Sequence, residues 1–303
     1  MWVLYVPWLL ILAFLATCAL FSLKKWRWAF LLIVILFIVN WYYEIIPSNV
    51  LASREVGEFK VMSWNINGSS EAILQDIISI GETILREDAD VVFLAEDYYE
   101  CCDSLDTLLK KAYPYSTHTV CNDCHYFYSK YPLGYHRWVA SEIDSMSCVI
   151  ESTVVIKGKT IGLYGCHLSS NNYSRDVAGR TDNRKGIFGL ASYLKSISEA
   201  SKLRTEEVKL MIGRLNQGWP TIMLGDMNDV CGSKPLNIMK SEGFTDAWSH
   251  GGVGYGATIH HPLPYRIDHI MYNDGLILKS IKKVDAKELS DHDALTAVFE
   301  IKQ

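Results

Sequence analysis

The sequence predicts an α/β domain, with a sheet at its centre and helices outside it, that follows two apolar helices. Strand-length segments rich in β-branched and aromatic residues recur from residue 59 onward, each bounded by Gly, Asn, Asp or Pro. Between them apolar residues recur at helical spacing, as at Ile187, Leu190 and Leu194. Mixed strands and helices in one stretch of chain indicate one α/β domain over residues 59–303. The predicted strands are 59–64, 91–96, 125–130, 148–156, 160–168, 221–226, 267–272 and 294–300, and the predicted helices are 72–87, 183–199 and 203–215.

The N-terminal region predicts a transmembrane hairpin over residues 1–47, followed by a short linker over 48–58. Residues 2–23 and 28–43 carry no charge, and the basic segment 24–27 separates them. The first run reaches the roughly 20 residues that a membrane-spanning helix needs, whereas the second is shorter. A cleaved signal peptide is the alternative for the first run, but no basic segment precedes it. Because cationic short loops stay in the cytoplasm, we expect a multi-pass protein of the inner or plasma membrane whose domain lies outside the cytoplasm.

Charge and cysteine content narrow the partners and the compartment. The chain has a formal net charge of −5. An acidic chain does not offer the broad cationic surface that a nonspecific nucleic-acid binder uses. Four cysteines cluster in sequence and predict one or two disulfides, with a zinc site as the alternative. These are Cys101, Cys102, Cys121 and Cys124. Cys148 and Cys166 lie in apolar strand-like runs and are expected to be small buried side chains.

Polar side chains follow most of the predicted strands at the point where each strand ends. Singly, each has an ordinary explanation, because Asn, Asp and Ser are common in turns. Together, carboxylates that converge at one edge of a sheet repel one another unless a cation or a shared proton neutralises them. Carboxylates and amides with little sulfur suit Mg²⁺, or Mn²⁺, better than zinc. The residues are Asn65, Asn67, Glu96, His167, Asp226, Asn228, Asp268, Asp291 and His292.

Seven short segments, in this order, resemble the endonuclease/exonuclease/phosphatase superfamily. They are WNIN, FLAED, YSKYPL, CHLSS, GDMND, RIDHI and SDHD, and the resemblance covers roughly residues 59–302. It implies a DNase I-like four-layered α/β sandwich, here in a membrane-anchored form of bacterial type. The inositol-polyphosphate phosphatase branch is disfavoured, because GDMND and YRID stand where that branch resembles GDLNYR and WCDR.

The resemblance also implies which residues hold the metal and meet the water. Asn65 and Glu96 match the positions that hold the divalent cation, with Asp291 close to it. Asp226 and Asn228 match the pair that faces the attacking water and the phosphate. These five residues would hold the cation and face the attacking water.

Two imidazoles complete the implied site. His167 matches a histidine that hydrogen-bonds a phosphate oxygen, and Asp268 matches the carboxylate that orients His292. His292 could take a proton from water, but Asp226 is a competing base, and the sequence leaves the choice between them open. Asp293 is expected to be solvated.

Cationic residues after CHLSS are candidates for substrate binding. Arg175, Arg180 and Arg184 could grip a second phosphate or a lipid headgroup, although a solvated loop is the alternative. In the next helix, Arg204, Glu206 and Glu207 are interpreted as a solvated face.

These features predict a monomeric, magnesium-dependent phosphodiesterase or phosphatase that is nuclease-like. The expected substrate is nucleic acid or a phosphorylated lipid or sugar headgroup. The alternative is a catalytically silent membrane protein that uses the same fold to bind a partner. Silent relatives usually lose the base, the metal carboxylate or the dyad, and this chain keeps all three.

Overall fold

The computed structural model describes residues 6–47, 59–67, 71–97, 99–117, 125–139, 147–171, 187–216, 218–259, 264–286 and 289–302. The strands are β1 (Phe59–Asn65), β2 (Val91–Ala95), β3 (Tyr115–Ser116), β4 (Tyr126–Ser129), β5 (Arg137–Trp138), β6 (Cys148–Ile156), β7 (Lys159–His167), β8 (Thr221–Asp226), β9 (Thr245–Asp246), β10 (Asp268–Tyr272), β11 (Leu276–Val284) and β12 (Ala294–Ile301). The helices are α1 (Val6–Ser22), α2 (Trp26–Tyr43), α3 (Glu71–Glu87), α4 (Tyr99–Leu109), α6 (Ile187–Ile212), α7 (Lys234–Ser241) and α8 (Ala247–Gly251). The linker 48–58 lies outside the described residues.

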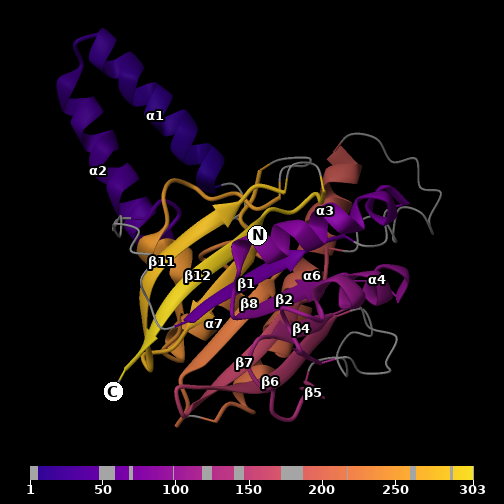
Figure 1. The fold of residues 1–303 in the computed structure, drawn as a ribbon. Coiled ribbons are helices and arrows are strands. Elements are labelled where there is room, and N and C mark those ends of the chain that lie inside the picture. Colours follow the sequence, from indigo (N-terminus) through magenta and orange to yellow (C-terminus); the bar gives the residue numbers. More distant parts are fainter. Residues whose placement is uncertain are drawn as a thin grey trace.

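Two mixed sheets form the centre of the domain (Figure 1). The first has the order β11-β12-β1-β2-β4-β3, and the second has the order β5-β6-β7-β8-β10-β9. Each sheet holds one parallel pair near its centre, β1 with β2 and β7 with β8, and antiparallel neighbours on both sides. Because the strands are buried on both faces, they consist of nearly continuous apolar runs rather than strict alternations.

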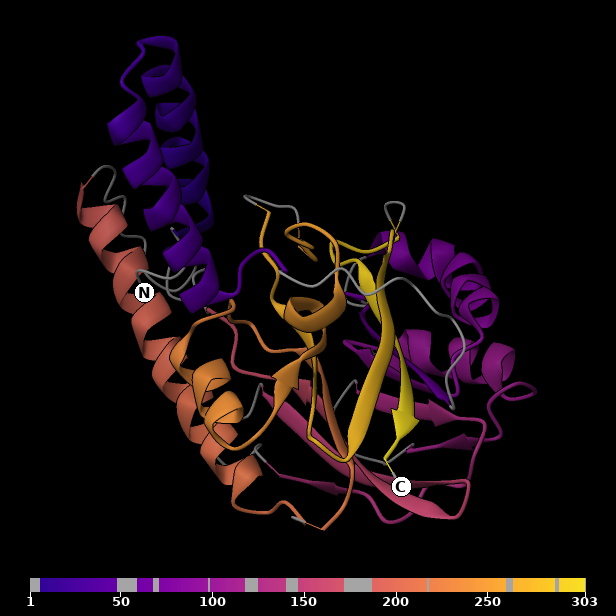
Figure 2. The ribbon, with the colours of Figure 1, turned by 90° about the vertical axis from the view of Figure 1, so that its left-hand side faces the viewer.

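Helices cover the outer face of each sheet and complete a four-layered α/β sandwich (Figure 2). Ile80 and Ile84 of α3, with Leu105 and Leu109 of α4, pack on the first sheet. On the second sheet the apolar layer comes from α6 and α7. The inner faces of the two sheets share the largest apolar cluster, which includes residues of both. The DNase I-like sandwich predicted from the sequence is therefore the fold of the domain.

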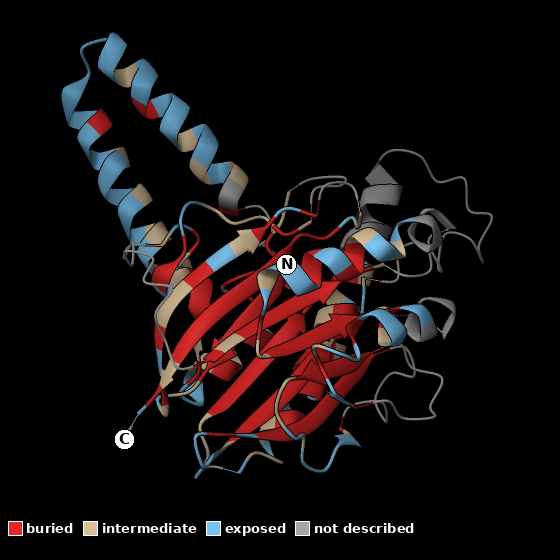
Figure 3. Cartoon of the chain, in the orientation of Figure 1, coloured by how far each residue is buried: buried red, intermediate tan, exposed pale blue. Residues whose placement is uncertain are grey.

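Helices α1 and α2 pack as a hairpin that projects from the domain, and most of its side chains are exposed (Figure 3). Phe37 and Trp41 are each 73% exposed, whereas Ala29 is buried where the two helices meet. Among the residues of the ranges given above, no helix combines the length and apolar character that crossing a membrane requires.

Two helices lie within residues 1–47, where the sequence predicts a hairpin, but they do not have the membrane-spanning character that was predicted. Helix α1 has 17 residues, which at 1.5 Å each give about 26 Å, short of a hydrocarbon core of about 30 Å. Helix α2 has 18 residues and contains Arg27 in its first turn and Asn40 near its end. The prediction of a multi-pass membrane protein with its domain outside the cytoplasm is therefore wrong by this criterion.

Two glycines allow the sheets to approach each other at the centre of the sandwich. A Cβ at Gly165 of β7 would lie 2.2 Å from a ring carbon of Phe93, which comes from β2 in the other sheet. A Cβ at Gly225 of β8 would lie 2.9 Å from a ring carbon of Phe93 across the sheets and 1.9 Å from the Cys166 carbonyl oxygen of neighbouring β7, and the φ of +137° at Gly225 also disfavours a side chain. The close contact between the two sheets at this point depends on both glycines.

Substitution Gly165→Ala is expected to lower the free energy of unfolding by about 1–3 kcal/mol, because the buried Phe93 ring must move to admit the methyl group. Chemical denaturation of the two proteins measures this difference. Gly213→Ala is the matched control, since its nearest neighbour would be 3.4 Å away. Equal stability of the two variants would show that the interior accommodates the methyl group.

Candidate active site

Both sheets place polar side chains at the same end. Parallel β1 and β2 are in register up to Asn65, so Asn65 and Glu96 emerge together from the first sheet. In the second sheet β7 and β8 pair His167 with Asp226, and antiparallel β10 pairs Asp268 with Asp226. Strand topology alone therefore brings together residues that are up to 203 positions apart in the sequence.

His292 reaches the same end on the loop before β12, which pairs antiparallel with β1. Trp64 Nε1 donates a hydrogen bond of 2.9 Å to the His292 carbonyl oxygen. Ser290 Oγ donates to the Asn65 carbonyl oxygen at 2.8 Å and accepts from His292 N at 3.1 Å. These contacts fix the loop to the end of β1 and hold His292 in the site.

Asp268 is the hydrogen-bond partner of His292. Nδ1 of the imidazole lies 2.8 Å from Asp268 Oδ2, and Nε2 lies 3.9 Å from Asp226 Oδ2. Thr258 Oγ1 accepts from the backbone nitrogen of Asp268 at 3.2 Å and so holds the start of β10. The imidazole is thus oriented on one side by Asp268 and faces Asp226 on the other.

Glu96, Asn65 and His167 form the other half of the site. Asn65 Nδ2 donates to Glu96 Oε1 at 3.0 Å and to Asp226 Oδ2 at 3.2 Å, so one amide joins the two carboxylates. Asn65 Oδ1 accepts from the backbone nitrogen of Asn67, so this oxygen is already engaged. His167 Nε2 lies 3.4 Å from Glu96 Oε1 and 3.9 Å from Asp226 Oδ2.

Three residues of the site have left-handed backbone conformations that non-glycine residues adopt at a cost. Their φ values are +48° at Asn67, +58° at Glu96 and +50° at Asn228. Asn228 donates from its backbone nitrogen to Asp226 Oδ1 at 2.8 Å and from Nδ2 to the Leu168 carbonyl oxygen at 2.9 Å. Asn228 therefore supports the segment after β7, and its side-chain amide is engaged there.

Burial and charge shift the pKa values of the central groups. Burial raises the pKa of Asp226, and the neighbouring Asp268 carboxylate raises it further. Burial lowers the pKa of His292, but the charge of Asp268 and its hydrogen bond outweigh burial, and the pKa rises to about 10. This shift favours the protonated imidazole, whose Nε2 is a donor, and leaves Asp226, 3.9 Å from Nε2, as the group that can accept a proton.

The donor set fits a divalent cation. Asp226 and Asp268 each offer a carboxylate oxygen, and these oxygens and a ring nitrogen of His292 lie within 4.8 Å of one another. Asp268 Oδ1 is buried and has no hydrogen-bond partner among the described residues. Crowded, buried carboxylates need positive charge. Glu96, which shares the Asn65 amide with Asp226, would offer the cation a further oxygen ligand. When bound, the cation would neutralise charge on the phosphate oxygens.

The structure does not place the other predicted residues in this cluster. Asp291 is exposed and raises the pKa of His292, and its Oδ1 accepts a hydrogen bond of 3.5 Å from Ser290 Oγ. Arg175, Arg180 and Arg184 lie outside the described residues. The side chains of the cysteine cluster 101–124 also lie outside them, while Cys148 and Cys166 are buried, as the sequence predicts.

The sequence did not predict the buried ion-pair network that contacts the segment after His167. Arg204 and Glu207 were predicted to face solvent, yet their exposed fractions are 1% and 0%. Arg204 Nε lies 3.0 Å from Asp229 Oδ2, and its Nη1 donates to the Ser169 carbonyl oxygen at 2.8 Å. Glu207 accepts from the backbone nitrogen of Ser169 at 3.1 Å. The network therefore holds the segment that follows His167 against α6.

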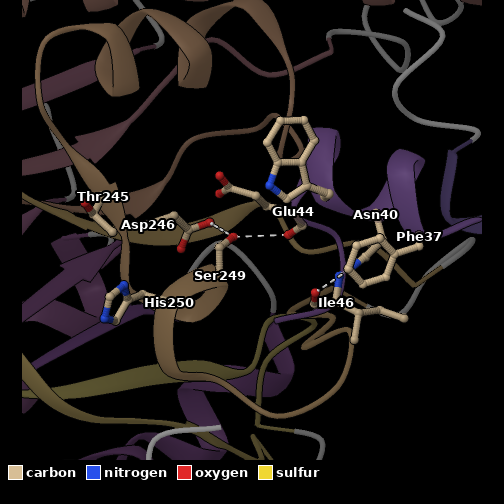
Figure 4. Close-up of a pocket in the computed structure, with 9 residues that line it drawn as sticks. Phe37, Asn40, Glu44, Ile46, Thr245, Asp246, Ser249 and His250 are labelled. Carbon is tan, nitrogen blue, oxygen red and sulfur yellow. Dashed lines mark hydrogen bonds between the residues drawn. The ribbon is translucent and has the colours of Figure 1, made fainter. Parts of the chain in front are cut away.

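A separate cavity of about 250 Å³ lies between α2 and α8, away from this cluster (Figure 4). Ser249 lies between two partners there, and its Oγ is 3.2 Å from both Asp246 Oδ2 and the Glu44 carbonyl oxygen. Lys240 forms an ion pair with the Glu44 carboxylate. The carboxylates of this cavity are thus neutralised by basic residues of the chain, Lys240 and Arg266.

Two sheets packed face to face between helices, with carboxylates and imidazoles gathered where the strands end, define a class of α/β proteins that includes metal-dependent phosphoesterases and nucleases. Residues 62–292 match the Endonuclease/Exonuclease/phosphatase family, and the chain belongs to this family. The comparison with curated proteins gives no match.

Several solved structures share the fold. Truncated TDP2 from Caenorhabditis elegans is 19% identical, with 80% of this chain and 96% of that chain covered and a TM-score of 0.57. Humanized D. rerio TDP2 is 16% identical, with coverages of 80% and 98% and a TM-score of 0.60. The human Nocturnin catalytic domain is 19% identical, with coverages of 80% and 93% and a TM-score of 0.58. Similar structures come from organisms as different as human and Staphylococcus aureus, so they do not distinguish the predicted bacterial type.

Proposed function

We propose that the protein is a magnesium-dependent hydrolase of phosphoesters, with Mn²⁺ as the alternative ion. The observation that supports this function best is the cluster of Asp226, Asp268 and His292, beside which Asn65 joins Asp226 to Glu96. Hydrolysis of a phosphoester needs an aligned water, neutralised phosphate oxygens and a proton acceptor. This end of the sandwich holds groups suited to all three tasks.

Asp226 is the proposed proton acceptor for the attacking water. Its raised pKa favours proton uptake, and His292, held protonated by Asp268, is better suited to stabilise negative charge on the phosphate. His167 would donate to another phosphate oxygen. Glu96 would hold the cation, and its carboxylate lies 3.4 Å from Nε2 of His167.

The proposed substrate class is a phosphodiester or phosphomonoester of nucleic acid or of a phosphorylated lipid or sugar headgroup. A similar structure, that of human Nocturnin, holds a sulfate anion, which has the tetrahedral shape of phosphate. The acidic net charge of −5 gives no general attraction for nucleic acid, so local contacts would have to select the substrate.

We expect the purified full chain to hydrolyse bis-p-nitrophenyl phosphate in the presence of Mg²⁺ or Mn²⁺. Addition of EDTA should abolish turnover, and excess Mg²⁺ should restore it, because the carboxylates of the site need a divalent cation to bind the anionic substrate. Release of p-nitrophenol measures the rate. Parallel assays on plasmid DNA, RNA, phospholipids and inositol phosphates then identify the substrate class.

Turnover that is indifferent to EDTA would contradict the metal-dependent mechanism. Failure to hydrolyse any of these phosphoesters would favour a protein that uses the fold to bind a partner. Comparison of bis-p-nitrophenyl phosphate with p-nitrophenyl phosphate separates diesterase from monoesterase activity.

A further inference from the structure

Two histidines from different sheets meet beside the site. His125 precedes β4 in the first sheet, and His167 ends β7 in the second. Nε2 of His125 lies 3.4 Å from Nδ1 of His167, with the ring centroids 4.9 Å apart and the rings inclined at 66°. His125 is 6% exposed. The contact is therefore a specific, buried bridge between the two sheets.

The backbone fixes where His125 carries its proton. The Glu96 backbone nitrogen donates a hydrogen bond of 3.1 Å to His125 Nδ1. A backbone N–H can only donate, so His125 Nδ1 must accept and carries no proton. The ring is then neutral with its single proton on Nε2, and this N–H is the donor in the contact with His167 Nδ1.

The same reasoning fixes the proton of His167. Since Nδ1 of His167 accepts from His125, a neutral His167 carries its proton on Nε2. That nitrogen faces the acidic half of the site, 3.4 Å from Glu96 Oε1 and 3.9 Å from Asp226 Oδ2. An N–H at this position can donate to a phosphate oxygen, whereas the other tautomer would present a lone pair and repel it.

We propose that His125 is a positioning residue that sets the tautomer of His167, so that the Nε2–H of His167 is directed at the substrate phosphate. The order of hydrogen bonds runs from the Glu96 amide to His125 and from His125 to His167. His125 also binds the amide of Glu96, whose φ of +58° is costly, and so supports the residue proposed to hold the cation. The kinetic part of this inference rests on the proposed function, but the tautomer does not.

Three variants of the full chain separate the two contacts of His125. His125→Phe keeps a ring of similar size and removes both hydrogen bonds. His125→Asn places an amide oxygen near the position of Nδ1, where it can accept from the Glu96 amide but is too short to reach His167. His125→Gln places an amide nitrogen near the position of Nε2, where it can donate to His167. His136→Phe, at an exposed histidine, is the control for loss of an imidazole.

We expect the Phe and Asn variants to lower kcat on bis-p-nitrophenyl phosphate by roughly 10- to 100-fold, the usual loss when a residue that orients a site ligand is removed. His125→Gln should lie closer to the wild type, because it restores the donor to His167. His136→Phe should leave kcat unchanged. If the Asn variant were near the wild type and the Gln variant as slow as Phe, the role of His125 would be confined to Glu96, and the proposal would be overturned.

Long-range ¹H–¹⁵N NMR correlations of the imidazoles test the tautomer directly. His167 should carry its proton on Nε2 in the wild type and in His125→Gln, and should populate both tautomers in His125→Asn. A wild-type proton on His167 Nδ1, or an unchanged tautomer in His125→Asn, would overturn the proposal. Thermal unfolding verifies that each variant is folded, and the Asn–Gln comparison decides the matter if the Phe variant is not. If the wild type hydrolyses no phosphoester, the proposed function fails while the NMR result still stands.

Discussion

Replacement of Asp226 by Asn is expected to lower kcat on bis-p-nitrophenyl phosphate by about 10²- to 10⁴-fold at saturating Mg²⁺. The variant loses the proposed proton acceptor and one carboxylate of the cation site while its shape is kept. Asn can still accept through its side-chain oxygen from the Asn228 backbone nitrogen, which donates to Asp226 Oδ1 at 2.8 Å. Steady-state kinetics with separate kcat and KM values measure the effect.

The stability of Asp226→Asn should not fall with its activity. Because the folded-state pKa of Asp226 is raised, its ionisation costs the folded state free energy as the pH rises above 3.8, the ordinary value. In EDTA at neutral pH, any loss of unfolding free energy in Asp226→Asn should therefore stay below about 1 kcal/mol, although the contact with Asn65 is altered. Denaturant unfolding at several pH values tests the sign.

A matched control comes from Asp274, an exposed aspartate just beyond the far end of β10. Asp274→Asn makes the same chemical change away from the site and should alter neither kcat nor stability measurably. Retention of more than about a tenth of kcat by Asp226→Asn would assign the proton transfer to another group.

The site could be predicted from the sequence because strand ends are local features. Asn65, Glu96, His167 and Asp226 each follow an apolar run, and the carboxyl ends of parallel strands must share one edge. The structure also has Asp268 rather than Asp291 or Asp293 as the hydrogen-bond partner of His292.

Elements without a clear apolar pattern were not predicted. β11 contains three lysines and a bulge between Leu278 and Ser280, which interrupts the alternation of buried and exposed positions. Helices predicted over 183–199 and 203–215 form one helix, α6, because no Gly or Pro stands between them.

Buried charges were the largest error of sequence interpretation. Arg204 and Glu207 are polar, but they share helical spacing with the buried Val208 and Met211 of α6, and this spacing was the available signal. Asp293 is also buried, with an ion pair to Lys283, although it was expected to be solvated. Such residues depend on partners far away in sequence, which periodicity does not reveal.

Substitution Arg266→Met is expected to lower the free energy of unfolding at neutral pH by about 3–5 kcal/mol, because it leaves the Asp246 carboxylate buried without its cation. Arg266 is 1% exposed and its Nη1 lies 2.8 Å from Asp246 Oδ2. The same carboxylate lies 3.1 Å from His269 Nδ1 and accepts from the Trp248 backbone nitrogen at the start of α8. Loss of Arg266 therefore affects β9, β10 and α8 together.

The pH dependence distinguishes a lost ion pair from lost packing. Burial alone would raise the pKa of Asp246, but Arg266 and His269 outweigh burial and hold it well below its usual range. Its stabilising effect is present above the unfolded-state pKa of 3.8 and is lost as the pH falls through the folded-state value. In Arg266→Met the carboxylate can be protonated at higher pH, so the stability difference from the wild type should shrink as the pH falls toward about 4.

Lys209→Met removes a cation from an exposed pair with Glu206 and should change stability by no more than about 0.5 kcal/mol at any pH. A second comparison uses the double variant Asp246→Leu/Arg266→Met, which removes both charges. If the double variant is more stable than Arg266→Met, the uncompensated carboxylate causes the loss, because no buried charge is then left without a partner. A double variant as unstable as the sum of its single variants, together with a difference that does not depend on pH, would instead assign the loss to the packing of the Arg266 side chain around α8.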